Sequence, residues 1–228
     1  MTTAALLALP VAAAAHAQPI AAPASTIPAA VKYNTAIKFL SFDHVRPYNS
    51  AITIRGQVLA TVNGHQGSVA NARVQLWRKW AGDSTFTYVK FATTSNGKYP
   101  QFRIDAITLA NAQYKIVFVG NPQLNPSSAI TTGSAFRLFH ASIKPGKPYA
   151  TISGQMSPAY AHGMVFLEMR TCTTCAWRRV RAKQTDGLSR WAFVAGAPPS
   201  GRYYWRVSTD ASLKFITSYS VVFYTQRG

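Results

Sequence analysis

The sequence predicts an all-β protein built from two similar antiparallel sandwiches that follow one another along the chain. Three observations support this fold class. Apolar residues alternate with polar ones over short runs, which is the period of half-buried strands. Turn signals rich in glycine, proline, asparagine and aspartate separate these runs, and no stretch keeps a helical period over three turns. The motifs of residues 51–129 then recur, in the same order, in residues 149–220.

The chain opens with a segment typical of export. Residues 4–15 are apolar and end in Ala15-His16-Ala17, a small-x-small pattern that predicts a signal peptide over 1–17. No Lys or Arg precedes this segment, so an alanine-rich disordered leader is the alternative. Residues 18–34 are rich in alanine and proline and are expected to form an extended leader. We therefore expect a secreted, extracellular protein at the cell surface, without a transmembrane segment.

From residue 35 onward, each run of alternating residues predicts one strand. Ile52 and Ile54 alternate with polar residues, and Val165, Leu167 and Met169 alternate with their neighbours in the second half. Five motifs agree in order, with an offset of about 90 to 98 residues, which predicts a duplicated domain. The matching segments are 51–58 with 149–156, 74–79 with 165–170, 93–102 with 183–193, 112–117 with 202–207, and 125–129 with 216–220.

The number of strands and the spacing of the turns narrow the choice among all-β folds. Roughly seven short strands in about 95 residues suit a sandwich of the immunoglobulin type. We expect two tandem antiparallel immunoglobulin-like (Ig-like) β-sandwich domains after the signal peptide, at 35–131 and 132–228. The boundary is placed in "NPSSAITTGSA", residues 125–135.

These motifs also carry a family resemblance. The run "TIRGQV", "ARVQLWRK", "SNGKYPQF", "AQYKIVF" and "NPSSA", and its second copy "ISGQM", "VFLEMR", "TDGLSRWAF" and "YYWRV", resemble the Ig-like β-sandwich modules of secreted actinobacterial proteins. The resemblance covers most of residues 36–228. It implies the sandwich fold and an extracellular location, and it implies no catalytic residue. Many such modules act as spacers, adhesion units or accessory domains.

The residues for catalysis or metal binding are sparse. Six acidic residues are scattered along the chain, no G-x-S-x-G occurs, and one C-x-x-C pair cannot complete a zinc site. Asp186, before Gly187, is predicted to be a turn residue, and Glu168 is predicted to point outward and pair with Arg179 or Arg181. We therefore expect no enzyme and no catalytic, cofactor-binding or metal-binding residue.

The two cysteines, Cys172 and Cys175, are expected to lie at the tip of a hairpin. Positions i and i+3 of a tight turn bring Cα atoms within about 7 Å, which overlaps the disulfide range. In an oxidising compartment the pair would form a disulfide. A redox pair, a metal ligand or free thiols are the alternatives, although no helix is predicted that would activate the first cysteine.

Charge points to an anionic partner. The chain has 24 Lys plus Arg against 6 Asp plus Glu, a formal net charge of +18. A cell-wall polymer, an acidic glycan or a surface protein are candidate partners, whereas export argues against nucleic acid. If Val180 and Ala182 face the core, then Arg179, Arg181 and Lys183 form one outward row. The expected anionic-ligand face comprises Arg170, Trp177, Arg179, Arg181 and Lys183, and a solvated strand without a ligand is the alternative.

Overall fold

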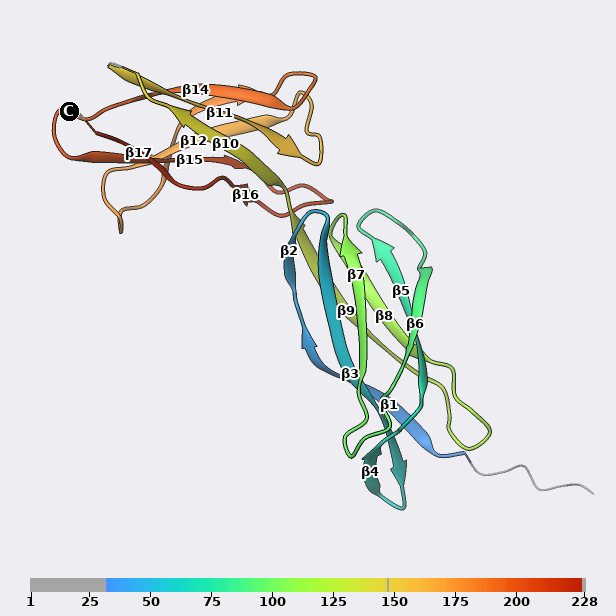
Figure 1. Cartoon of the computed structure of the whole chain (residues 1–228). Coiled ribbons are helices and arrows are strands. Elements are labelled where there is room, and N and C mark those ends of the chain that lie inside the picture. Colours follow the sequence, from blue (N-terminus) through green and yellow to red (C-terminus); the bar gives the residue numbers. More distant parts are fainter. Residues whose placement is uncertain (1–31, 147, 227–228) are drawn as a thin grey trace, which may run out of the picture. The chain divides into compact units, whose positions relative to one another are not determined.

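The computed structural model describes residues 32–146 and 148–226. These residues form seventeen strands and no helix, so the predicted all-β class with antiparallel sheets is confirmed (Figure 1). The expected signal peptide, residues 1–17, and residues 18–31 of the expected leader lie outside the described residues. The end of that leader is already structured, because Tyr33 bridges to Leu124 and Asn34 opens the first strand.

Residues 34–136 form two sheets. In one, β3 (Ser50–Val62) is central and pairs with β1 (Asn34–Phe42), β4 (His65–Ser68) and β7 (Phe102–Thr108). The other has the order β2 (Val45–Pro47), β9 (Ser127–Phe136), β8 (Ala112–Phe118), β5 (Arg73–Trp80) and β6 (Thr87–Thr93). All pairs are antiparallel except β2 with β9.

Alternate side chains of these strands form one buried cluster. Ile52, Ile54 and Val58 of β3 are fully buried, while the side chains of the other face of the strand, Thr53, Arg55 and Gln57, are more exposed. Tyr114 and Ile116 of β8 are buried in the same alternating way. The cluster thus draws its residues from both sheets, and the alternation in the sequence predicted which side chains face it.

Residues 138–226 form two further sheets. One has the order β10 (Leu138–Lys144), β11 (Tyr149–Ser157) and β14 (Arg190–Gly196). The other has the order β13 (Arg178–Gln184), β12 (Met164–Arg170), β15 (Arg202–Thr209) and β16 (Ser218–Tyr219), and β17 (Phe223–Gln226) also pairs with β15. A second buried cluster includes Ile152, Leu167, Trp191, Trp205 and Val207.

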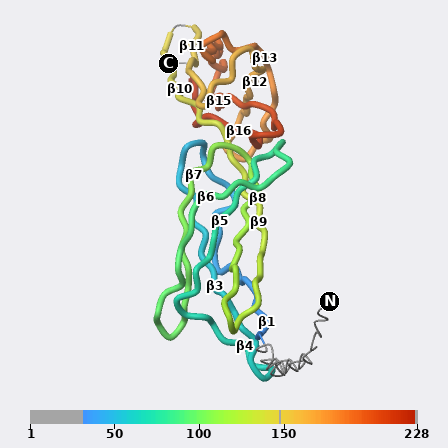
Figure 2. The backbone as a smooth tube through the Cα atoms, turned by 90° about the vertical axis from the view of Figure 1, so that its right-hand side faces the viewer, coloured from blue at the N-terminus to red at the C-terminus, as the bar shows by residue number. Residues whose placement is uncertain are grey.

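Both halves have the same strand plan. β3 lies between β1 and β7 as β11 lies between β10 and β14, and β5 lies between β6 and β8 as β12 lies between β13 and β15. Figure 2 shows β5, β8 and β9 of the first half running alongside one another. A Cβ atom on Gly56 of β3 would lie within 3 Å of the Phe102 ring, and one on Gly154 of β11 would lie 2.8 Å from the Trp191 ring. These pairings are those of an Ig-like sandwich. The count of two domains stays a prediction.

The strand pairing corrects the alignment of the two halves at one motif. Leu76 pairs with Ile116 and Leu167 pairs with Val207, so residues 112–117 match 203–208 rather than 202–207. The expected boundary between 131 and 132 falls inside β9, which remains paired with β8 up to Gly133. The chain therefore enters the next sheet later than the motif spacing indicated.

Two predicted turns have the expected local geometry. Asn63 and Gly64, between β3 and β4, have φ angles of 49° and 80°, the left-handed pair that a two-residue hairpin requires. The Asp186 carboxylate accepts hydrogen bonds from the backbone N–H groups of Leu188 (2.9 Å) and Arg190 (2.8 Å). The bond from the Arg190 backbone is the main reason that the pKa of Asp186 lies below its usual value.

Candidate functional site

Three of the five residues expected to form the anionic-ligand face lie on one side of the β13-β12-β15 sheet. Leu167 of β12 is buried in the core, so Glu168 and Arg170 project from the opposite side. Trp177, from the segment that joins β12 to β13, contacts Arg170 there, and Arg179 of β13 reaches Glu168. The structure thus brings Arg170, Trp177 and Arg179 together around Glu168.

Aromatic rings hold two of the arginines on this side. The guanidinium carbon of Arg170 lies 4.5 Å from the centroid of Trp177 and 5.5 Å from that of Tyr204. The guanidinium carbon of Arg206 lies 4.4 Å from Trp177 and 4.0 Å from Tyr219. Such contacts are attractive because the face of an aromatic ring is negative. We call Arg170, Trp177, Tyr204, Arg206 and Tyr219 the arginine–aromatic face.

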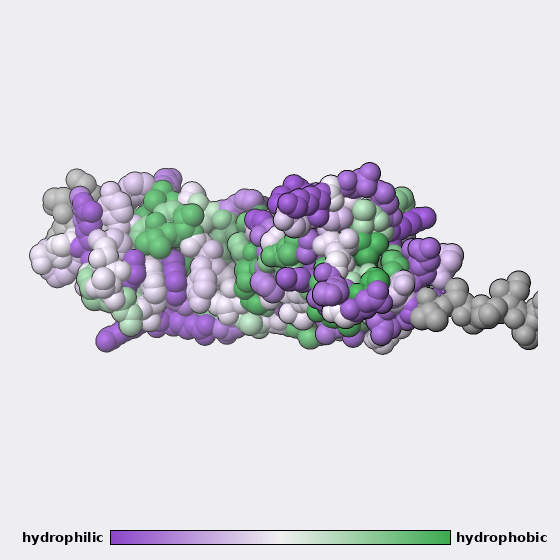
Figure 3. Space-filling model, turned by 90° about the horizontal axis from the view of Figure 1, so that it is seen from below, coloured by the Kyte–Doolittle hydropathy of each residue, from purple (hydrophilic) through white to green (hydrophobic). Residues whose placement is uncertain are grey.

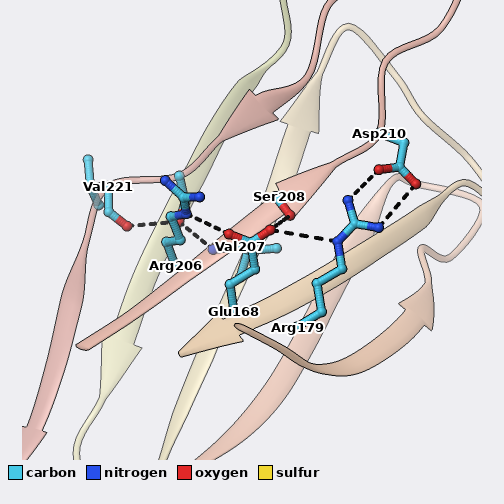
Figure 4. A network of polar contacts seen from close by, with 8 residues as sticks. Glu168, Arg179, Arg206, Val207, Ser208, Asp210 and Val221 are labelled. Carbon is cyan, nitrogen blue, oxygen red and sulfur yellow. Dashed lines mark hydrogen bonds and ion pairs between the residues drawn. The ribbon is translucent and has the colours of Figure 1, made fainter. Parts of the chain in front are cut away.

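Glu168 differs from the exposed residue that the sequence predicted. It is only 6% exposed and accepts hydrogen bonds from Arg206 Nε (2.6 Å) and Ser208 Oγ (2.7 Å), as Figure 4 shows. The expected pair with Arg179 is present but longer, at 3.8 Å, and the alternative partner, Arg181, is not used. The Glu168 carboxylate can be buried because β15 supplies two hydrogen-bond donors directly beside it. One of the two, Arg206, is the residue that pairs with Glu168 across the strands.

Arg179 has two acidic neighbours. Its guanidinium group donates to the Asp210 carboxylate, which raises the pKa of Arg179 (Figure 4). It also stacks on the Phe166 ring at 3.9 Å from the centroid, besides its ion pair with Glu168. The charge of Arg179 is therefore largely compensated within the protein.

Arg181 and Lys183 lie on the other side of β13, so the expected single row with Arg179 is not formed. Arg181 pairs with Leu167, whose side chain faces the core. The register then shifts by one residue, and Glu168 pairs with Arg179. Because paired residues of neighbouring strands share a face, this bulge separates Arg179 from the two basic residues that follow it.

Sequence reasoning missed Arg206 and Tyr219. Trp205 and Val207 are both buried, so the alternation on β15 could have placed Arg206 outside, but the alignment error of one residue obscured this. Tyr219 has no comparable signal, because it reaches the face only through the pairing of β16 with Ser208 of β15. By contrast, Trp191 and Trp205 are buried core residues.

The predicted disulfide is present. Cys172 and Cys175 are bonded, with Cα atoms 5.1 Å apart, in the turn that joins β12 to β13. The N–H of Cys175 also donates to the carbonyl of Cys172 at 3.4 Å. The bond therefore closes a very short loop two residues before Trp177.

The arrangement can attract anions, and its carboxylates are already in use. Glu168 and Asp210 both bind arginines, so neither is a free acid or base. Within residues 32–146 and 148–226, no group of three or more His, Cys, Asp or Glu could hold a metal ion. No helix formed by these residues could span a membrane.

Comparison with known proteins does not identify a family. No protein-family model matches the sequence, and no curated protein matches it. Among solved structures, a chain of "Cytokine receptor complex - Crystal form 1A" is 11% identical, with 82% of this chain and 94% of that chain covered and a TM-score of 0.40. The human OSCAR ligand-binding domain is 12% identical, with coverage of 85% and 99% and a TM-score of 0.26. Similarity this low supports no functional argument.

Proposed function

We propose that the protein is a secreted, non-enzymatic binding module that attaches to an anionic polymer or acidic glycan of the cell surface through the arginine–aromatic face. This face belongs to the second of the two expected Ig-like sandwiches. The predicted export signal and the resemblance to secreted modules support an extracellular role. The formal net charge of +18 favours anionic partners over the whole surface. Adhesion or spacing between surface components would follow from such attachment.

The observation that carries the proposal is that Arg170 has a fixed guanidinium group without a carboxylate partner among the described residues. Arg179 and Arg206 have carboxylate partners, whereas Arg170 has no ion pair within the described residues. Its Nε is buried and has no hydrogen-bond partner, although the side chain as a whole is partly exposed. Trp177 and Tyr204 hold the guanidinium group in place, so little side-chain freedom is lost when an oxyanion binds.

The rings beside these cations suit a polymer ligand. Tyr219 is 47% exposed, and its ring borders Arg206. Sugar rings and repeating anionic groups can use an exposed ring and a cation side by side. More generally, hydrophobic and hydrophilic residues are interspersed on the side of the molecule shown in Figure 3.

Retention on immobilised heparin and on isolated cell wall tests the proposal. Arg170→Gln should elute at lower salt than the unmodified protein, because a preorganised cation is lost. Arg55→Gln is the matched control, since Arg55 is exposed on β3, outside the arginine–aromatic face, and the change removes the same charge. Equal elution of the two variants, or no retention of the unmodified protein at physiological salt, would contradict the proposal.

A further inference from the structure

We propose that the open side between β13 and β14 binds an extended acidic peptide of a partner protein, which adds a strand to the free edge of β13. This inference goes beyond the proposed polymer binding, because it concerns other residues and another class of ligand. It also assigns a role to Arg181 and Lys183, which the arginine–aromatic face does not use.

Two adjoining hollows mark this side of the protein. One has a volume of about 360 Å³ and the other about 300 Å³, and they share Lys183 and Ala192. We call them together the edge groove, lined by residues 181–186 and 190–194. Its walls come from strands of two different sheets, and the nearly buried rings of Trp191 and Phe193 contribute to its lining.

Both walls of the edge groove are free strand edges. In the described part of the chain, β13 pairs only with β12, and β14 pairs only with β11. All seven residues of β13 are exposed. A free edge presents unpaired N–H and C=O groups, and an extended peptide can satisfy them by adding a strand. A polymer without a peptide backbone cannot use these groups.

The basic residues of the edge groove favour an acidic peptide as its ligand. Arg181 and Lys183 have no ion pair among the residues that the structure describes, whereas Arg190 pairs with Asp186 at 2.9 Å. Basic residues on an edge strand repel another copy of the same edge, which argues against self-association of β13. Cross-strand neighbours of opposite charge are instead stabilising.

The spacing of the two basic residues gives the pattern of the ligand. Arg181 and Lys183 are two residues apart, so they lie on one side of β13 at a separation of about 6.7 Å along the strand. An added strand has the same period of two. The partner segment should therefore carry acidic residues at alternate positions, facing the edge groove.

Fluorescence anisotropy with a labelled Thr-Glu repeat peptide of ten residues tests this directly. We expect saturable binding to the full chain, and Arg181→Glu with Lys183→Glu should weaken it by about tenfold or more. The same double variant should gain binding of the Thr-Lys repeat peptide. Lys38→Glu with Arg55→Glu is the matched control, because it changes the net charge equally at exposed positions of β1 and β3.

Two further measurements separate strand addition from simple charge attraction. Methylation of all peptide nitrogens of the Thr-Glu peptide keeps its charge and should abolish binding. Hydrogen exchange of the β13 amides, residues 178–184, should slow when the unmodified peptide binds. Equal binding of the methylated peptide, or unchanged exchange in β13, would overturn the proposal. Arg170→Gln should leave peptide binding unchanged, because Arg170 lies outside the edge groove. A negative result for peptide binding is therefore independent of the result for polymer binding.

Discussion

Replacement of Glu168 by glutamine tests whether one buried carboxylate holds the arginine–aromatic face in place. The change keeps the size of the side chain and removes its charge, while Arg206 Nε stays 2.6 Å from the former carboxylate oxygen. Glutamine has one acceptor oxygen and an NH₂ group that only donates. Its oxygen can accept from Arg206 while its NH₂ donates to the Ser208 hydroxyl, which now donates at 2.7 Å, so both contacts can be kept. Neither is then a bond to a charged carboxylate, and Arg206 loses its carboxylate partner.

The size of the effect follows from these two bonds. Hydrogen bonds to a charged group contribute about 1.5–3 kcal/mol each, and removal of one partner from a buried ion pair costs about 3–5 kcal/mol. The Arg206 side chain remains 21% exposed, so water compensates part of the loss. We expect Glu168→Gln to lower the free energy of unfolding by about 2–3 kcal/mol.

Urea denaturation followed by tryptophan fluorescence measures this loss. Asp83→Asn is the matched control, because Asp83 is exposed and has no ion pair within the described residues. Glu168→Leu combined with Arg206→Met should cost less than Glu168→Gln alone, since an apolar pair leaves no buried charge. If Glu168→Gln costs less than about 0.5 kcal/mol, as surface changes do, the carboxylate does not organise this face.

Two other substitutions and the reduction of the disulfide also have expected outcomes. Gly154→Ala should destabilise the fold by about 1–3 kcal/mol in urea denaturation, because the added Cβ would clash with the backbone oxygen of His140 and lie 2.8 Å from the Trp191 ring. Gly187→Ala, with open space around it, should be nearly neutral, and equal costs would contradict the packing argument. Reduction of the bond between Cys172 and Cys175 should keep the far-ultraviolet circular dichroism and cost at most about 2 kcal/mol, since the closed loop is very short; loss of the fold would show a larger role. The folded pKa of Asp186 is depressed, so its ionised form adds stability above the unfolded pKa of about 3.9 and loses it as pH falls through the folded value. Asp186→Asn should therefore lower the melting temperature at pH 7 but not at a pH below the folded pKa of Asp186, and a pH-independent difference would refute this.

Local features were predictable from the sequence because each depends on neighbours along the chain. The alternation in β3 identified Ile52 and Ile54 as core residues, and the Asn63-Gly64 turn adopted the expected left-handed angles. The spacing of Cys172 and Cys175 predicted their disulfide for the same reason, since a tight turn alone brings them within reach.

The candidate site was only partly predictable. Arg170 and Trp177 were identified as members of a basic, aromatic surface, and the structure does bring them together. Arg206 was hidden by an alignment error of one residue, which in a strand exchanges the core face for the outer face. The signal peptide and the two-domain division remain predictions.

The sequence by itself determined the fold class, the local turns and the disulfide of this protein. Only the tertiary structure decided the partners of Glu168, because Arg206 and Ser208 come from a strand that lies far along the chain. It also decided which basic residues share a surface. A bulge in β13 sends Arg179 to one side and Arg181 to the other, and a bulge depends on how two strands pair rather than on the pattern within either one.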